Sequence, residues 1–143
     1  MTSPQHIFLK YLSKKGMAAT EQRRVVLEVF LKSKGHFSYK ELYIQVREAD
    51  SSISSVTVYR TVKLLDKCGI AEAIDFGDGI TRYECRYNRP HHDHLVCTKC
   101  GKKIGVVDDS IENLQELLAE KHGFSIKRHK MILFGICSDC RDS

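Results

Sequence analysis

Apolar side chains in the first half of this chain recur at helical spacing in four successive segments. Hydroxyl side chains that suit N-caps precede three of these segments, and Ser38 with Glu41 has the spacing of a capping box. Gly16 and Gly69 follow the first and the last segment, as glycine often does at a helix end. The pattern therefore predicts helices within residues 7–15, 21–32, 39–49 and 56–67.

Shorter apolar runs follow these helices and read mainly as strands. Residues 70–76 and 80–86 flank Gly77-Asp78-Gly79, which has the composition of a hairpin turn. Helices followed by a two-stranded hairpin are the order of a winged helix-turn-helix domain. Beyond Pro90 we expect strands at 95–97 and 103–107, a helix at 111–122 and one long strand over 124–136. The predicted fold class is α+β, with a winged helix-turn-helix domain followed by a small α+β domain.

Composition allows one ordinary core or two small ones, and the excess positive charge lies in the first half of the chain. The 143 residues are 42% hydrophobic, and the net charge of +5 lies entirely in residues 1–90. A basic half suggests an acidic partner, although a solvated basic surface would look the same. No segment approaches the ~20 apolar residues of a membrane span, and the N-terminus does not have the pattern of a signal peptide. We therefore expect a cytoplasmic protein without a membrane partner.

The last helix of the first half carries side chains that suit DNA. Thr57, Tyr59 and Arg60 offer hydroxyl and cationic groups on one short stretch. Such groups bind phosphate oxygens, base edges and thymine methyls in the major groove. The alternative is that Tyr59 packs in the core and Arg60 is merely solvated.

Cysteine and histidine residues gather in the second half. Two Cys-x-x-Cys pairs can supply four thiolates, which is a complete tetrahedral ligand set for Zn²⁺. A redox-active pair is the rival interpretation, but neither pair opens a helix after a strand. The pairs are Cys97 with Cys100 and Cys137 with Cys140.

A His-His-Asp-His sequence precedes the first pair, at residues 91–94. Because an extended backbone alternates its faces, His92 and His94 should point one way and His91 and Asp93 the other. Imidazoles with carboxylates suit Zn²⁺, Fe²⁺ and Mn²⁺. Candidate partners for the two faces are His36, Glu84, Glu112 and His129.

Several of these motifs together resemble the ferric uptake regulator family. They are Thr57-Val58-Tyr59-Arg60-Thr61, the Gly77-Asp78-Gly79 turn with Arg82-Tyr83-Glu84, the His-His-Asp-His cluster running into Cys-x-x-Cys-Gly, Lys121-His122-Gly123-Phe124, and the final Cys-x-x-Cys. The resemblance covers the chain from Gly16 onward. It implies a DNA-binding domain at 1–86, a hinge at 87–90 and a dimerisation and metal-binding domain at 91–143.

The resemblance also assigns roles to individual residues. Structural zinc would be held by Cys97, Cys100, Cys137 and Cys140. The regulatory metal site would comprise His36, Glu84, His92 and His94, and a further site in the dimerisation domain His91, Asp93, Glu112 and His129. DNA contacts would come from Thr57, Tyr59, Arg60 and, near the end of the first helix, Lys15.

Three positions depart from the family pattern. Gly105 stands where the family usually has a carboxylate ligand, which would leave the regulatory site with four protein ligands. The segment 17–20 lacks the usual lysine, which leaves backbone contacts to cations such as Lys15, Arg23 and Arg24. Cys85 follows Glu84, and only one of the two can face the site from a strand. Glu84 would give a site suited to Fe²⁺ or Mn²⁺, whereas Cys85 would favour Zn²⁺.

The resemblance implies a repressor that senses Fe²⁺, with Mn²⁺ or Zn²⁺ as other candidate metals, and controls iron homeostasis genes. Its partners would be an AT-rich inverted-repeat operator and a second copy of the chain, as a dimer or a tetramer. A zinc-sensing or peroxide-sensing member of the same family is the alternative. We do not expect an enzyme; a small zinc hydrolase or a metal-storage protein are the rival classes.

Overall fold

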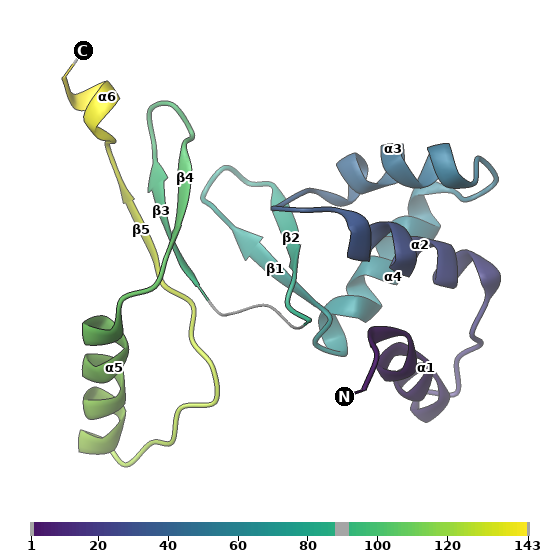
Figure 1. The fold of residues 1–143 in the computed structure, drawn as a ribbon, viewed down its shortest axis with the longest axis horizontal. Coiled ribbons are helices and arrows are strands. Elements are labelled where there is room, and N and C mark those ends of the chain that lie inside the picture. Colours follow the sequence, from purple (N-terminus) through teal and green to yellow (C-terminus); the bar gives the residue numbers. More distant parts are fainter. Residues whose placement is uncertain (1, 88–91, 143) are drawn as a thin grey trace. The chain divides into compact units, whose positions relative to one another are not determined.

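The computed structural model describes residues 2–87 and 92–142 and divides the chain into two compact units, Met1–Pro90 and His91–Ser143. Within the described residues, the first unit holds helices α1 to α4 and the two-stranded sheet β1–β2, and the second holds β3 to β5 with α5 and α6 (Figure 1). No helix in these two stretches is both long and apolar enough to cross a membrane.

Four helices form the body of the first unit: α1 (Pro4–Lys14), α2 (Glu21–Lys32), α3 (Tyr39–Ala49) and α4 (Ser55–Lys67). Each begins after a hydroxyl residue whose side chain accepts a backbone N–H of the first turn, and these caps are Ser3, Thr20, Ser38 and Ser54. The predicted capping box of α3 is present. The apolar stripes of the helices meet in one core, which includes Leu12, Leu27, Phe30, Leu42, Val58 and Leu65.

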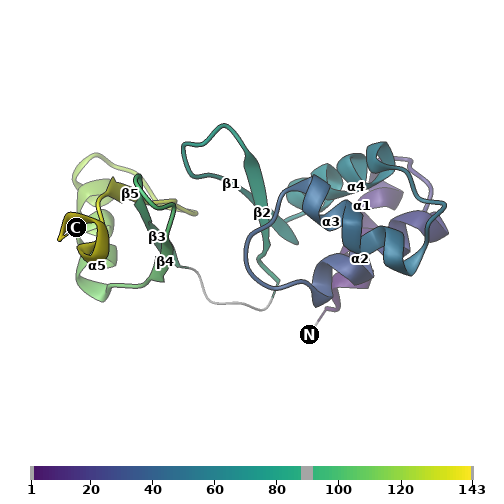
Figure 2. The same ribbon diagram turned by 90° about the horizontal axis from the view of Figure 1, so that it is seen from above.

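A hairpin follows the helices, as the sequence predicts. Strand β1 (Ala71–Asp75) pairs antiparallel with β2 (Thr81–Cys85), and each strand is shorter than its apolar run. Gly77 and Gly79 take φ values of 89° and 77° in the turn, a region that favours glycine. The hairpin projects from one end of the helical bundle (Figure 2). Helices followed by this hairpin confirm the winged-helix order.

The second unit is a small sheet with two helices. Its elements are β3 (Asp93–Cys97), β4 (Lys103–Val106), α5 (Asp109–Lys121), β5 (Ile132–Gly135) and α6 (Ser138–Arg141). Strand β3 is central, antiparallel to β4 and parallel to β5. The Asp108 carboxylate caps α5 by accepting the backbone N–H groups of Ser110 and Ile111. Helix α5 lies beyond one end of the sheet rather than over its face (Figure 1).

The prediction of one long strand over residues 124–136 is wrong in its first part. Only Ile132–Gly135 is a strand, and residues 124–131 have no regular structure. The physical reason is that β3, the pairing partner, begins at Asp93. The Asp93 carboxylate accepts the Met131 N–H at 3.0 Å, so this N–H bonds to a side chain rather than to a neighbouring strand. Alternation alone could not reveal where the partner strand ends.

Candidate metal centres and nucleic-acid interface

The four cysteines of the two Cys-x-x-Cys pairs come together at one end of the second unit. Cys97 ends β3 and Cys100 lies on the turn to β4. Cys137 is the N-cap of the four-residue helix α6 after β5, and Cys140 lies in α6, so the expectation that neither pair opens a helix after a strand is wrong for the second pair. Their sulfurs lie within 4.8 Å of one another, and the Sγ atoms of Cys100 and Cys137 are 3.8 Å apart. A Zn–S bond of about 2.3 Å in a tetrahedron sets neighbouring sulfurs about 3.8 Å apart. The donor set therefore fits Zn²⁺.

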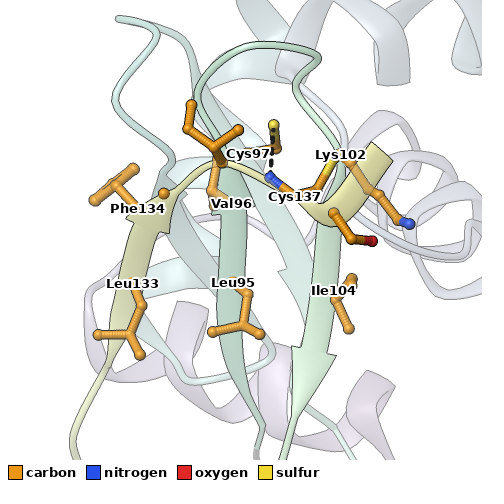
Figure 3. A pocket seen from close by; sticks show the side chains of 11 residues that line it. Leu95, Val96, Cys97, Lys102, Ile104, Leu133, Phe134 and Cys137 are labelled. Atoms are coloured by element: carbon orange, nitrogen blue, oxygen red, sulfur yellow. Dashed lines mark hydrogen bonds between the residues drawn. The ribbon is translucent and has the colours of Figure 1, made fainter. Parts of the chain in front are cut away.

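Backbone groups already stabilise one of these sulfurs as a thiolate. The N–H groups of Cys100 and Cys137 each donate to the Cys97 sulfur at 3.4 Å, and Figure 3 shows the second of these bonds. These bonds lower the pKa of the Cys97 thiol to about 6. A hydrogen bond with the Cys137 thiol, with a contribution from burial, raises the pKa of the Cys140 thiol to about 12. Four thiolates without a cation would repel one another, which is the electrostatic condition that a divalent metal relieves.

A second cluster lies wholly within the second unit. The His129 Nε2 atom is 3.3 Å from Oδ2 of Asp93 and 3.3 Å from Oε1 of Glu112. Asp93 is buried, and the segment before β5 brings His129 to it. One imidazole and two carboxylates are a mixed donor set that suits Zn²⁺, Fe²⁺ or Mn²⁺. His91, the fourth expected member, lies outside the described residues.

Two of the expected regulatory ligands meet within the first unit. His36, just before the α3 cap, places Nε2 3.1 Å from Oε2 of Glu84 on β2. Glu84 is 7% exposed, and its partner is half-buried. Cys85 faces away from this pair and belongs to the apolar core with Tyr83 and Leu42. Since strand neighbours point to opposite faces, Glu84 rather than Cys85 is the side chain beside His36.

A partly buried ion pair lies next to Glu84. Glu72 on β1 is the direct cross-strand partner of Glu84, and both carboxylates are buried. Like charges directly opposite in a sheet repel each other. Glu72 forms an ion pair with Arg86, which compensates this charge. Sequence analysis had not singled out Arg86, because its role depends on the strand register.

The other two expected regulatory ligands lie together in the second unit. The His92 and His94 rings are 4.8 Å apart at an interplanar angle of 63°, while Asp93 belongs to the other cluster. This separation follows the predicted alternation. Gly105 is the β4 partner of His94, and a Cβ added to it would lie 2.8 Å from Cδ2 of His92. The His92 ring thus occupies the space that a side chain at position 105 would need.

The expected DNA-contacting residues lie on the surface of the first unit. Tyr59 is 42% exposed and Arg60 is exposed, so the interpretation of Tyr59 as a core residue is wrong. Burial of Val58 and Val62 gives α4 an inner face opposite these groups. The Thr57 hydroxyl takes part in the α4 cap by accepting from the Ser54 hydroxyl at 3.1 Å.

The cations expected to contact the DNA backbone, one at the end of α1 and two in α2, have different partners. Arg24 pairs with Glu21 and Glu28, and Arg23 donates to a backbone carbonyl at 2.5 Å. Lys15 is exposed, with its ammonium 5.9 Å from the centroid of the Tyr11 ring. Of these three cations, Arg24 alone has carboxylate partners within the described residues.

Comparison with known proteins agrees with this architecture. The sequence profile of the ferric uptake regulator family matches residues 14–134. The ferric uptake regulation protein of Campylobacter jejuni is 39% identical over 137 residues, which are 94% of this chain and 87% of that protein.

Two solved structures show the same fold. The ferric uptake regulator of Helicobacter pylori, described as having three functional metal-binding sites, superposes with a TM-score of 0.80 at 30% identity and covers 99% of this chain and 96% of that one. A zinc-bound manganese uptake regulator has a TM-score of 0.62 at 41% identity, covering 91% and 98% of the two chains.

Proposed function

Because this chain belongs to the ferric uptake regulator family, a family of metal-dependent regulators, we propose that it is a homodimeric repressor that senses Fe²⁺. In this proposal the metal-loaded dimer binds an AT-rich inverted-repeat operator and controls iron homeostasis genes. Its role is regulatory rather than enzymatic, and its place of action is the cytoplasm, where the operator DNA is.

The choice of metal rests on one observation, which is the identity of the side chain that faces His36. That side chain is the Glu84 carboxylate, whereas the Cys85 thiol lies in the apolar core. Nitrogen and oxygen donors suit Fe²⁺ and Mn²⁺, and a thiolate would have favoured Zn²⁺. Manganese sensing is the second candidate, because a manganese uptake regulator is 41% identical to this chain.

We assign the regulatory site to two half-sites, one built within each unit. His36 and Glu84 form the first, and His92 and His94 form the second. These four side chains would hold a divalent cation, whose positive charge would draw them together. The two half-sites then select one arrangement of the units, and binding energy is used to favour that state. Gly105 contributes no carboxylate, so solvent is left to complete the coordination.

The remaining clusters take supporting roles. Cys97, Cys100, Cys137 and Cys140 hold structural Zn²⁺, which fixes α6 to the end of β3. Asp93, Glu112 and His129 form a further site, to which the proposal adds His91. The proposed domains are 1–86 for DNA binding, 87–90 as hinge and 91–143 for dimerisation and metal binding. The Helicobacter pylori relative is described as having three functional metal sites, which supports this number here.

Exposed apolar side chains support self-association through the second unit. Leu133, Leu95 and Ile104 form a row across the three strands (Figure 3), and each is 38% exposed or more. On α5, Leu114, Leu117 and Leu118 are each at least 59% exposed. A small unit with this much uncovered apolar surface is typical of a chain that associates with a second copy.

Tyr59, Arg60, Thr57 and Lys15 are the proposed DNA contacts. In a winged helix the exposed face of the recognition helix enters the major groove, and Tyr59 and Arg60 stand on that face of α4. The Tyr59 ring can contact thymine methyls, and Arg60 can bind phosphate or a base edge. Lys15 adds a phosphate contact from the end of α1. Two copies of the chain would bind the two repeats of the operator, one copy to each.

The experiment is DNA binding by fluorescence anisotropy at fixed salt, with structural zinc retained and exchangeable metal removed. Anaerobic Fe²⁺, Mn²⁺ and buffered Zn²⁺ are titrated separately against an AT-rich inverted repeat and a scrambled duplex. We expect Fe²⁺ and Mn²⁺ to tighten binding to the repeat alone. Activation by Zn²⁺ only would move the assignment to a zinc sensor, and the absence of specific DNA binding would contradict the proposal.

A further inference from the structure

The aromatic ring of Tyr39 contacts the exposed ring of Tyr59. Tyr39 is the first residue of α3, and Tyr59 stands on α4. Their ring centroids are 5.0 Å apart with an interplanar angle of 68°, an edge-to-face contact. An exposed tyrosine would otherwise sample several rotamers, and this contact favours one of them.

A double backbone bridge fixes the segment that carries Tyr39. The Phe37 N–H donates to the Tyr83 carbonyl at 3.1 Å, and the Tyr83 N–H donates to the Phe37 carbonyl at 2.8 Å. The sequence neighbours of these two residues, His36 and Glu84, are the pair whose side chains meet at 3.1 Å. The same bridge therefore sets the position of Tyr39 and that of the first metal half-site.

The two residues between His36 and Tyr39 are both held in place by hydrogen bonds. Ser38 accepts the Glu41 N–H at 3.2 Å through its hydroxyl, and its own N–H donates to the Glu41 carboxylate at 2.9 Å. Phe37 is held by the bridge and is 5% exposed. A displacement of His36 would thus be passed along two anchored residues to the first turn of α3.

We propose that Tyr39 is a positioning residue for DNA recognition, which orients the Tyr59 ring and links the His36–Glu84 pair to the recognition helix. This inference rests on the proposed function, since it assumes that Tyr59 reads the operator. Metal binding that draws His36 and Glu84 together fixes the segment from residue 36 to 39. The fixed Tyr39 ring then holds Tyr59 in the orientation that the major groove requires.

The test is a double-mutant cycle on operator binding with Mn²⁺, using the full chain. We expect Tyr39→Ala to weaken binding about three- to tenfold, the range of an aromatic pair contact. In the Tyr59→Ala background the same change should cost almost nothing, because the ring that it positions is gone. The dependence of affinity on salt should stay unchanged, since no cation is lost. Tyr39→Phe keeps the ring and should restore binding.

Tyr43→Ala is the matched control, because Tyr43 lies one turn further along α3 and packs against Arg47. At equal folded fraction, checked by circular dichroism, it should leave operator affinity within about twofold of wild type. Tyr39→Leu replaces the alanine variant if the latter fails to fold. Additive losses from Tyr39→Ala and Tyr59→Ala, or wild-type binding by Tyr39→Ala, would overturn the inference. If the wild-type protein shows no metal-dependent binding to the operator, the proposed function is overturned instead.

Discussion

Two adjacent residues of β2 have opposite surroundings, and this decides the chemistry of the regulatory half-site. Glu84 meets His36, and Cys85 is buried among apolar side chains. The sequence showed that only one of them could face the site but could not say which, because that depends on the strand register. The same period of two correctly separated Asp93 from His92 and His94, since that separation needs only an extended backbone.

Glu84→Gln should weaken activation of DNA binding by Mn²⁺ at least tenfold, because an amide is a poorer ligand than a carboxylate. Cys85→Ser should leave the metal concentration for half-activation nearly unchanged and lower the free energy of unfolding by about 1 to 3 kcal/mol, because it buries a hydroxyl. The measurements are anisotropy titrations and urea unfolding. A larger loss of activation in Cys85→Ser than in Glu84→Gln would show that the thiol is the ligand.

Among the elements, those defined by local signals were predicted well and those defined by distant pairing were not. Helices α2, α3 and α4 follow from their caps and apolar stripes, which lie within each segment. The strand predicted at 124–136 shortened to β5 because pairing with β3 sets its length. The four-residue helix α6 was missed, since the clustering of Cys137 and Cys140 with distant cysteines determines its position.

The zinc cluster should be what holds α6 to the end of β3. Cys137→Ser removes one of the four sulfur ligands, so we expect loss of tightly bound zinc. The melting temperature should fall by several degrees, and cleavage after residue 135 by a protease should accelerate. Cys68→Ser, a cysteine of the first unit, is the control and should keep the full zinc content. Unchanged zinc content in Cys137→Ser, measured by mass spectrometry of the native protein, would exclude the four-cysteine site.

At the scale of the whole molecule, the two units differ in how well they bury their apolar side chains: the first buries them well and the second does not. The helical unit encloses a continuous core, whereas α5 has no buried residue. The second unit therefore lacks enough internal packing to account for its own apolar side chains. A second copy of the chain would cover them, and it would also supply the second recognition helix for an inverted repeat.

Leu117→Asp should shift the protein toward monomer, because it places a charge on the exposed apolar side of α5. Leu9→Asp is the matched control, since Leu9 is 52% exposed on α1 of the first unit. Sedimentation velocity at micromolar concentration should show a dimer for wild type and Leu9→Asp. A stable dimer in Leu117→Asp would show that α5 lies outside the interface.

The central claim is that a metal ion and operator DNA are coupled through His36, Glu84, His92 and His94. Such coupling is reciprocal: operator DNA must tighten metal binding by the factor by which metal tightens DNA binding. The most direct measurement is therefore Mn²⁺ affinity with and without saturating operator, at fixed salt, with a scrambled duplex as control. The account predicts a rise of about ten- to a hundredfold with operator only, and none in Glu84→Gln. Equal Mn²⁺ affinity with operator, with the scrambled duplex and without DNA would contradict it.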